Sequence, residues 1–394
     1  MLIDRPYLTS TLADLVRINS INPAFSGGTT DERAIVTYLG KAMTALGMEV
    51  QTFVPELSRP SVVGRMRGTG AGRSLLLYAH VDTVGVEGMQ EPFSAEIREG
   101  RMFGRGTYDM KGGMAACLAA AKAIADAKTA LAGDLLIAGV ADEEVASIGM
   151  SDVLRHVRAD AAIVTEATEL ALCVAHKGFS WIEVKTLGRA AHGSRFMEGI
   201  DANMRMGRFL AQLDVLERQL RLRDPHPLVG PPSLHAGVLQ GGTGTSTYAA
   251  ESRVEIERRM VPGETEAGVV AEIQAIIDRL TAADPSFSAT VRPFLTRPAF
   301  ETDPSSDLVR VVRNSASSAL GTAPDVIGVP YWMDASLLSE TGIPTVVIGP
   351  IGAGAHAAVE WVDLDSVARV AEILAKSAVA LCSEEGVMSD ASLG

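Results

Sequence analysis

Four apolar runs of strand length constrain the fold of this chain more than any other feature of its sequence. They are SLLLYAH (74–80), DLLIAGVAD (134–142), AAIVTEA (161–167) and PTVVIGP (344–350). Their apolar residues are continuous, which is typical of strands buried on both faces of a parallel sheet. The Ala-rich stretch 114–127, after Gly112 and Gly113, predicts a helix between two of these strands. We therefore expect an α/β domain with a mixed, mostly parallel sheet flanked by helices.

The middle of the chain follows a different pattern. Residues 179–188 and 251–261 alternate apolar with polar side chains, as in a sheet that has one face in water. Residues 202–223 and 268–282 have the spacing of amphipathic helices. This combination indicates a smaller α+β domain.

Chain length agrees with a division into two domains. At 394 residues the chain exceeds what one hydrophobic core usually serves. We expect the α+β domain at 178–293, inserted into a larger domain made of residues 1–177 and 294–394. The last dozen residues are expected to fray.

Charge and composition argue against several classes of partner. The net charge is −13, from 35 Lys and Arg against 48 Asp and Glu, which disfavours nucleic acid and anionic membranes. No apolar run approaches the ~20 residues of a membrane span. The first twenty residues lack the pattern of a signal peptide, so a cytoplasmic location is expected. The cysteines Cys117, Cys173 and Cys382 are far apart, and their spacing indicates neither a disulfide framework nor a cysteine-zinc cluster.

Each of the four apolar runs is followed by a histidine or a carboxylate. In chain order these polar residues are His80 and Asp82, then Glu143 and Glu144, then Glu166, and finally His356 after a Gly-rich turn. In open α/β sheets, ligands bind outside the carboxyl ends of the strands. The sequence therefore predicts that these side chains meet at one sheet edge.

A glycine-rich stretch adds one more carboxylate. GRGTYDMKGG (104–113) places Asp109 in a loop before the Ala-rich helix, and glycine permits such a tight loop. Two histidines with several carboxylates and no thiolate suit zinc, cobalt or manganese in a hydrolytic site. Taken singly, each residue also fits a structural role, as a satisfied histidine, a helix N-cap or a solvated turn. Their coincidence at one edge favours the metal site.

Seven ordered motifs carry a resemblance to a known family over nearly the full length. They are HVDTV (80–84), GRGTYDMKGG (104–113), ADEE (141–144), the strand before Glu166, GRAAHGS (188–194), ERRMVPGE (257–264) and GPIGAGAHAAVEWV (349–362). The chain resembles the co-catalytic zinc hydrolases that include acetylornithine deacetylase, succinyl-diaminopimelate desuccinylase, aminoacylase and bacterial glutamate carboxypeptidase. The resemblance implies a zinc-peptidase-like catalytic domain and an inserted dimerisation or lid domain.

The resemblance also implies a metal-ligand set. His80 and Glu166 would bind one zinc ion, Glu144 and His356 would bind a second, and Asp109 would bridge the two. Cobalt or manganese could take the place of zinc.

Three further residues receive roles from the resemblance. Asp82 would accept a hydrogen bond from the second imidazole nitrogen of His80 and so fix its tautomer. Glu143 would act as the general base on a zinc-activated water. His192 matches a histidine that stabilises the oxyanion, usually across a dimer interface. Without the resemblance, His192 would be taken as a surface loop residue.

The resemblance also implies that an arginine binds the carboxylate of the substrate. Arg259 matches the family arginine that holds a substrate carboxylate, because it stands three residues before Pro262. The alternative is that Arg258 and Arg259 form a solvated pair on an exposed strand.

Two departures from the family pattern bear on the substrate. In GGTGTSTYAA (241–250), Ser246 and Ala249 stand where many relatives have asparagine and proline, which weakens an assignment to the acetylornithine or succinyl-diaminopimelate reaction. Trp332 and Met333 stand where others have smaller or more polar groups. They would suit an apolar substrate group or, equally, core packing.

The sequence thus predicts a metal-dependent amidohydrolase that cleaves an N-acyl amino acid or a small peptide with a free carboxylate. A dipeptidase or carboxypeptidase with the same two-zinc site is the alternative, and an inactive metal-binding protein is a second one. The resemblance implies a homodimer, because the inserted domain of that family usually pairs edge to edge or through helices, and an exposed strand edge needs such cover. Nucleic acid and membrane partners are not expected.

Overall fold

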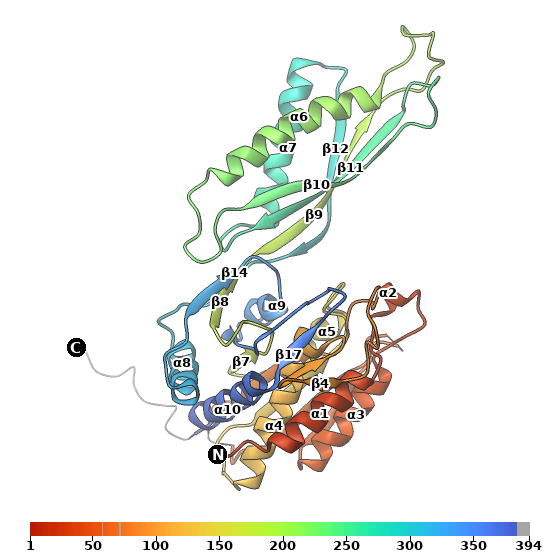
Figure 1. Ribbon diagram of the computed structural model, residues 1–394. Coiled ribbons are helices and arrows are strands. Elements are labelled where there is room, and N and C mark those ends of the chain that lie inside the picture. Colours follow the sequence, from red (N-terminus) through yellow and green to blue (C-terminus); the bar gives the residue numbers. More distant parts are fainter. Residues whose placement is uncertain (57, 71, 384–394) are drawn as a thin grey trace, which may run out of the picture. The chain divides into compact units, whose positions relative to one another are not determined.

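The chain divides into two compact units in the computed structural model, which describes residues 1–56, 58–70 and 72–383 (Figure 1). The larger unit comprises Met1–Val174, Thr302–Ile327 and Met333–Gly394, and the smaller unit comprises Ala175–Glu301 and Gly328–Trp332. The main segment of the smaller unit overlaps the inserted domain predicted at 178–293. The frayed end expected in the last dozen residues lies outside the described residues from 384 onward.

The larger unit alternates helices and strands along the chain. Its helices are α1 (Arg5–Arg17), α2 (Pro23–Ser26), α3 (Arg33–Ala45), the kinked helical turn η1 (Thr107–Lys111), α4 (Gly112–Asp126), α5 (Ile148–His156), α8 (Asp307–Leu320), α9 (Ala335–Glu340) and α10 (Leu364–Leu381). Its strands are β1 (Glu49–Phe53), β2 (Ser61–Met66), β3 (Leu75–His80), β4 (Glu96–Arg98), β5 (Arg101–Phe103), β6 (Leu135–Val140), β7 (Ala161–Val164), β15 (Thr345–Val347), β16 (Gly352–Ala353) and β17 (Trp361–Asp363).

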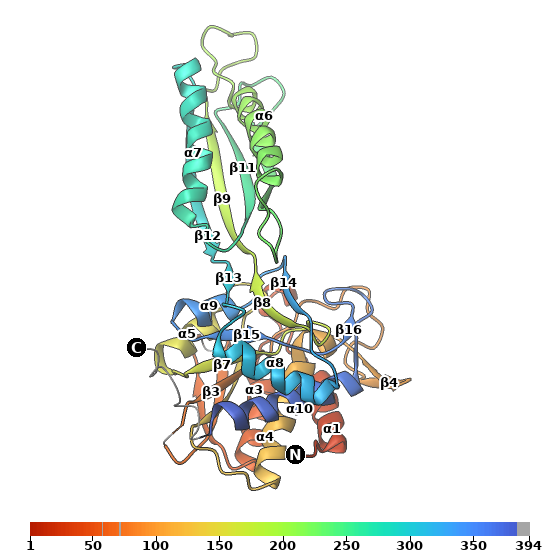
Figure 2. The ribbon, with the colours of Figure 1, turned by 90° about the vertical axis from the view of Figure 1, so that its left-hand side faces the viewer.

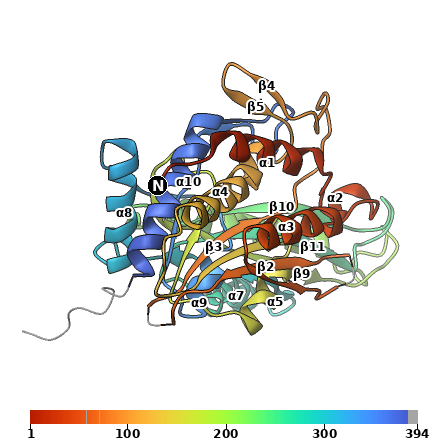
Figure 3. The same cartoon turned by 90° about the horizontal axis from the view of Figure 1, so that it is seen from below.

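The central sheet of the larger unit is mixed and mostly parallel at its centre, which confirms the predicted fold class. Its order is β1-β2-β6-β3-β7-β15-β8, where β8 spans Leu172–His176. Strand β3 pairs in parallel with β6 and β7, and β15 pairs in parallel with β7. Every residue of β3 and β6 is buried, because α4 and α10 cover one face and α5 and α9 cover the other (Figure 3). The predicted strands at 74–80, 134–142, 161–167 and 344–350 are all present.

Helix α4 confirms the helix predicted at 114–127 and packs tightly against the sheet. Its first turn contains Gly113, where an added Cβ atom would lie only 2.4 Å from the carbonyl oxygen of Thr165. Glycine therefore allows the start of the helix to approach the end of β7. This contact lies between Asp109, just before the helix, and Glu166, just after the strand.

A second, four-stranded sheet in the larger unit has the order β16-β17-β5-β4. Its strands pair antiparallel, and β17 joins the segment that follows His356 to the segment that precedes Asp109. Two sequence motifs that are far apart in the chain are thus held next to one another.

The smaller unit is an antiparallel sheet with two helices on one face (Figure 2). Its elements are β9 (Gly178–Leu187), α6 (Ala202–Arg221), β10 (Ser233–Gly241), β11 (Glu251–Met260), α7 (Glu266–Ala283), β12 (Ser288–Arg297) and β13 (Phe300–Glu301). The sheet order is β10-β11-β9-β12. Strand β14 (Val326–Val329), like β8, runs from the larger unit into the smaller one.

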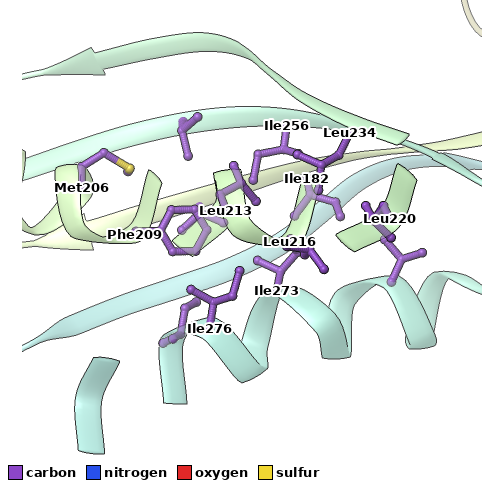
Figure 4. Close-up of a cluster of buried hydrophobic side chains, with 14 of the residues drawn as sticks. Ile182, Met206, Phe209, Leu213, Leu216, Leu220, Leu234, Ile256, Ile273 and Ile276 are labelled. Carbon is purple, nitrogen blue, oxygen red and sulfur yellow. The ribbon is translucent and has the colours of Figure 1, made fainter. Parts of the chain in front are cut away.

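Alternation along the strands places the core of the smaller unit under its helices. In β9 and β11 every second side chain is buried, as the sequence predicted. Ile182, Val254 and Ile256 pack there against Phe209 of α6 and Ile273 of α7 (Figure 4). The intervening residues of both strands face away from the helices, and most of them are partly exposed, whereas Phe179 is 9% exposed. Within the described residues, no helix combines the length and the apolar character that a membrane span requires.

Candidate metal centre

The predicted polar residues of the larger unit lie at the carboxyl ends of its parallel strands. His80 is the last residue of β3, and Glu166 follows β7. Glu143 and Glu144 follow β6, and His356 lies between β16 and β17 of the second sheet. Since β6, β3 and β7 are neighbours in one sheet, their ends bring the first four side chains together, and the loop of His356 reaches the same edge.

Two groups of three side chains share one carboxylate. In the first, Nε2 of His80 lies 3.1 Å from Oδ1 of Asp109 and 3.3 Å from Oε1 of Glu166. In the second, Nε2 of His356 lies 3.3 Å from Oδ2 of Asp109 and 3.0 Å from Oε2 of Glu144. Within each group the potential ligand atoms all lie within 4.8 Å of one another. Asp109 thus offers one oxygen to each group.

The chemistry of these groups fits divalent cations. Each group offers one imidazole nitrogen and two carboxylates, a donor set that binds zinc, cobalt or manganese. Burial raises the pKa of Glu144 to about 7, and neighbouring Asp109 adds to the increase. Buried carboxylates this close together need positive charge between them. The structure therefore contains a candidate metal site.

Both imidazoles balance the charge of these carboxylates. Hydrogen bonds to Asp109 and Glu144 raise the pKa of His356 to about 10. Burial works to lower the pKa of His80, but Glu166 and Asp109 raise it well above its ordinary range. The side chain of His356 is 56% exposed whereas that of His80 is fully buried, so the centre is open to solvent on the His356 side.

Glu143 lies beside the centre and outside both groups. Its side chain is partly buried. Burial raises the pKa of Glu143 well above its ordinary range, with His80 opposing the increase and Glu166 adding to it. A carboxyl group that titrates above its usual range, next to a metal site, suits proton transfer.

Asp82 makes a different contact from the one predicted. The Nδ1 atom of His80 is 3.0 Å from the backbone carbonyl oxygen of Asp82, but 3.7 Å from its carboxylate oxygen Oδ1. The carboxylate instead accepts hydrogen bonds from the backbone N–H groups of Glu143 (3.2 Å) and Glu144 (3.4 Å). Asp82 therefore fixes the His80 ring through its main chain, and its side chain fixes the turn that carries Glu143 and Glu144.

A buried polar network holds the turn that carries the two glutamates. The Nδ2 atom of Asn22 donates to Asp82 (2.8 Å) and to Asp142 (2.9 Å). Asp142, whose φ of 75° lies in the left-handed region, also pairs with Arg59 at 2.7 Å. Arg59 in turn makes three hydrogen bonds to the fully buried Glu32. The strained turn is thus secured from its buried side.

A second buried pair holds the loop of Asp109. Glu360 accepts hydrogen bonds from the backbone N–H groups of Gly106 (3.0 Å), Tyr108 (2.9 Å) and Asp109 (3.1 Å). Arg105 donates to Glu360 at 2.6 Å and to the carbonyl oxygen of Ala357 at 3.0 Å. Because Ala357 follows His356, the Arg105–Glu360 pair ties the loops of two metal-site residues together.

Sequence reasoning missed these supporting residues. Arg105 lies in the motif 104–113 and Glu360 in the motif 349–362. A charged residue within a Gly-rich stretch was the sequence signal that could have indicated their supporting role. Tyr78 is a polar residue within the apolar run 74–80, and its hydroxyl donates to the buried Asp334 at 2.5 Å. Asn22 caps the short helix α2, and only its position in the fold reveals its second role.

The predicted His192 lies in the smaller unit, on an exposed loop. The backbone N–H of Ser194 donates to its Nδ1 atom at 3.2 Å, so the neutral ring carries its proton on Nε2. The loop is fixed by a hydrogen bond from the N–H of Gly193 to the carbonyl oxygen of Ser246 at 2.7 Å. An exposed imidazole with Nε2–H available can donate to an oxyanion.

The two arginines of the smaller unit differ in their surroundings. Arg258 is fully buried and pairs with Glu264 at 2.6 Å and Glu272 at 3.4 Å. Arg259 faces the other side of the sheet, and its side chain is 31% exposed. The exposed guanidinium is the one suited to bind a ligand. Met333 is 1% exposed, so its side chain belongs to the core.

Comparison with known proteins agrees with this geometry. The model of the peptidase family M20/M25/M40 matches residues 76–380. The chain belongs to this family. It is therefore a hydrolase that acts on amide bonds, and the resemblance found in the sequence is confirmed.

Curated relatives in the family are deacylating enzymes. The chain is 28% identical over 383 residues to N-formyl-4-amino-5-aminomethyl-2-methylpyrimidine deformylase of Bacillus subtilis, covering 89% of this chain and 90% of that protein. It is also 28% identical over 391 residues to acetylornithine deacetylase of Myxococcus xanthus, covering 96% and 98%.

Solved structures show the same fold. A tripeptidase of Staphylococcus aureus aligns with a TM-score of 0.79 at 21% identity, covering 97% of this chain and 100% of that chain. A dinuclear metal-binding peptidase of Bacillus subtilis aligns with a TM-score of 0.74 at 16% identity, covering 96% and 98%.

The Arg105–Glu360 pair gives a testable prediction for metal binding. Glu360→Gln removes the charge opposite a buried arginine and replaces one of the two oxygens that accept backbone N–H groups by an NH2 group, which cannot accept. We expect zinc affinity to fall about 10- to 100-fold, because the Asp109 loop loses its support. Competition with a zinc chelator measures this. Glu96→Gln, in an exposed strand, is the control, and wild-type affinity in Glu360→Gln would refute the role.

Proposed function

We propose that this hydrolase removes the acyl group from an N-acyl amino acid and releases an amino acid and a carboxylic acid. The observation that supports this most is the pair of three-residue groups sharing Asp109, with Glu143 beside them. The two named relatives above, a deformylase and a deacetylase, both remove an acyl group from an amine. Family membership shows that the chain hydrolyses amide bonds, and our proposal concerns which amide is its substrate.

Zinc is the proposed metal, with His80, Asp109 and Glu166 in one position and Asp109, Glu144 and His356 in the other. When bound, two zinc ions polarise an amide carbonyl and acidify water. Fixed ligand positions matter for this chemistry, since an ion held loosely would not orient the carbonyl. The buried contacts of Asp82 and Glu360 supply that rigidity.

Glu143 is the proposed general base and acid. Its carboxylate takes a proton from the attacking water and then gives it to the departing amine nitrogen. A pKa raised by burial favours holding the proton between these two steps. Because the N–H of Glu143 donates to Asp82, the main chain at this residue is held in place during both steps.

His192 is the proposed donor to the oxyanion. Its Nε2–H can stabilise the negative oxygen that forms when water attacks the carbonyl. In the family resemblance this histidine acts on the partner's site, so we also propose a homodimer formed through the smaller unit. The strand edge at β10 supports this proposal, because Leu239 is 56% exposed there.

Arg259 is the proposed ligand for the substrate's carboxylate, since a guanidinium can make two parallel hydrogen bonds to it. A dipeptidase or carboxypeptidase remains the alternative, because a peptide also carries a free carboxylate. An inactive metal-binding protein is disfavoured, since all five ligand positions and Glu143 are occupied by suitable residues. A cytoplasmic location stays a prediction.

A substrate panel tests the proposed function. Zinc-loaded protein is offered N-acetyl, N-succinyl and longer N-acyl amino acids and unblocked dipeptides, and amine release is measured with and without a chelator. We expect hydrolysis confined to N-acyl compounds and lost with the chelator. Preference for dipeptides would overturn the deacylase assignment in favour of a peptidase, and activity that survives complete metal removal would overturn the zinc mechanism.

Glu143→Ala tests the general base. We expect the turnover number to fall by roughly 10²- to 10⁴-fold, the typical contribution of a positioned base. Metal content should stay at the wild-type level, because Glu143 belongs to neither three-residue group. Glu340→Ala, an exposed glutamate of the same unit, is the control. Near-normal turnover in Glu143→Ala would eliminate the assignment.

His192→Ala tests the oxyanion donor. We expect kcat to fall roughly 10²- to 10³-fold with little change in KM, because the oxyanion exists only near the transition state. A change in KM alone would instead indicate ground-state binding.

Mixing variants tests the action of His192 across the dimer. Equal amounts of Glu143→Ala and His192→Ala protein are mixed under conditions that exchange subunits. A hybrid dimer would contain one complete site, so about a quarter of wild-type activity should return. Activity that stays at the sum of the separate variants, or a protein that sediments as a monomer, would contradict the proposal.

A further inference from the structure

Four aromatic side chains gather on the helix-free face of the smaller unit's sheet. We call Phe179, Trp181, Phe294 and Trp332 the aromatic cluster. The ring centres of Phe179 and Trp181 are 5.3 Å apart, those of Trp181 and Phe294 are 6.0 Å apart, and those of Phe179 and Trp332 are 6.0 Å apart. These spacings are typical of rings in direct contact.

Strand alternation explains why the cluster lies on this face. Ile182 and Val184 of β9 point into the core under α6 and α7, so the side chain of Trp181 points the other way. Phe294 lies where the pairing of β12 with β9 is irregular, between Pro293 and Leu295. Phe294 is 43% exposed, whereas Phe179 is 9% exposed. Core formation therefore accounts for Phe179 but not for Phe294.

Arg259 is built into the aromatic cluster. Its Cζ atom lies 5.3 Å from the ring centre of Phe179, its register partner on β9. Glu257 accepts one hydrogen bond from Nε of Arg259 (2.7 Å) and another from Nε1 of Trp181 (3.0 Å). The shared carboxylate thus holds the guanidinium and the indole next to one another. Since Glu257 binds Arg259 through Nε, the two terminal nitrogens can be offered to a ligand.

Local charge also favours an anionic ligand. Arg297 lies over the ring of Trp332, with its Cζ atom 5.8 Å from the ring centre. Burial lowers the pKa of Lys177, the charges of Arg259 and Arg258 lower it further, and Glu264 opposes them, so Lys177 is a third cation close to the two arginines. This surface therefore offers a guanidinium to the negative charge of an anion and aromatic rings to its apolar group.

We infer that the aromatic cluster and Arg259 together bind the amino-acid half of the substrate and select an aromatic or large aliphatic side chain. The identity of the ligand as a substrate rests on the proposed function. The carboxylate and the side chain of an amino acid leave the same carbon atom. A carboxylate on Arg259 therefore brings the side chain to the rings that surround this arginine, whereas the acyl group lies on the far side of the amide nitrogen.

A binding experiment tests the surface without catalysis. The metal-loaded protein is titrated with 3-phenylpropionate and with propionate, and tryptophan emission is followed, because two of the three tryptophans lie in the cluster. We expect 3-phenylpropionate to bind about tenfold more tightly than propionate, the magnitude of one good ring contact. Equal affinity for the two acids would overturn the inference.

Variants locate the bound acid on the surface. Phe294→Ala should weaken 3-phenylpropionate binding about tenfold and leave propionate unaffected, and Arg259→Ala should weaken both. Leu222→Ala, an 85% exposed apolar residue at the end of α6 and outside the cluster, is the matched control and should match the wild type. If 3-phenylpropionate binds Phe294→Ala as tightly as the wild type, or if removing the metal is enough to abolish binding, the acid binds elsewhere and the inference is overturned.

Kinetics separate this inference from the proposed function. We expect kcat/KM for N-acetylphenylalanine to exceed that for N-acetylalanine at least tenfold, and Phe294→Ala to reduce this ratio while Leu222→Ala preserves it. If both compounds are hydrolysed equally well, the proposed function stands and the side-chain selection is refuted. If neither is hydrolysed but 3-phenylpropionate binds as expected, the proposed function fails and the binding surface stands.

Discussion

The candidate centre depends on the sharing of Asp109 between two imidazoles. Each oxygen of this carboxylate faces one histidine, and each histidine faces a further glutamate. Three carboxylates so close together repel one another unless positive charge lies between them. This electrostatic requirement explains why the residues around the centre are arranged to resist movement, since small displacements would raise the repulsion sharply.

The surrounding buried pairs hold backbone in place. Glu360 accepts hydrogen bonds from three backbone N–H groups of the Asp109 loop, including that of Asp109 itself. Asp82 accepts hydrogen bonds from the N–H groups of the two glutamates after β6. Buried ion pairs such as Arg105–Glu360 contribute little net stability, because desolvation offsets their attraction. Their contribution here is geometric: they bring loops from distant parts of the sequence to fixed positions at one sheet edge.

The smaller unit supports recognition in the proposed mechanism. Its two sheet faces differ in character: one is an apolar core under α6 and α7, and the other carries Arg259, whose guanidinium lies beside the ring of Phe179. Neighbouring arginines consequently have separate roles, because Arg258 is buried in ion pairs and Arg259 faces outward. A single step along the strand moves a guanidinium from a buried ion pair to the partly exposed face, where we propose that it binds a ligand.

The sequence by itself determined the fold class and four strands of the central sheet, because continuous apolar runs are local patterns. Its polar strand ends, a glycine-rich loop and the family resemblance pointed to His80, Asp109, Glu144, Glu166 and His356, which the structure brings together. The sequence did not determine the contacts of Asp82, whose main chain rather than side chain meets His80. Nor did it reveal Asn22, Arg59, Glu360 or the aromatic cluster. These depend on segments that are distant in sequence meeting at hydrogen-bond or ring-contact distance, and only the tertiary structure decides which segments meet.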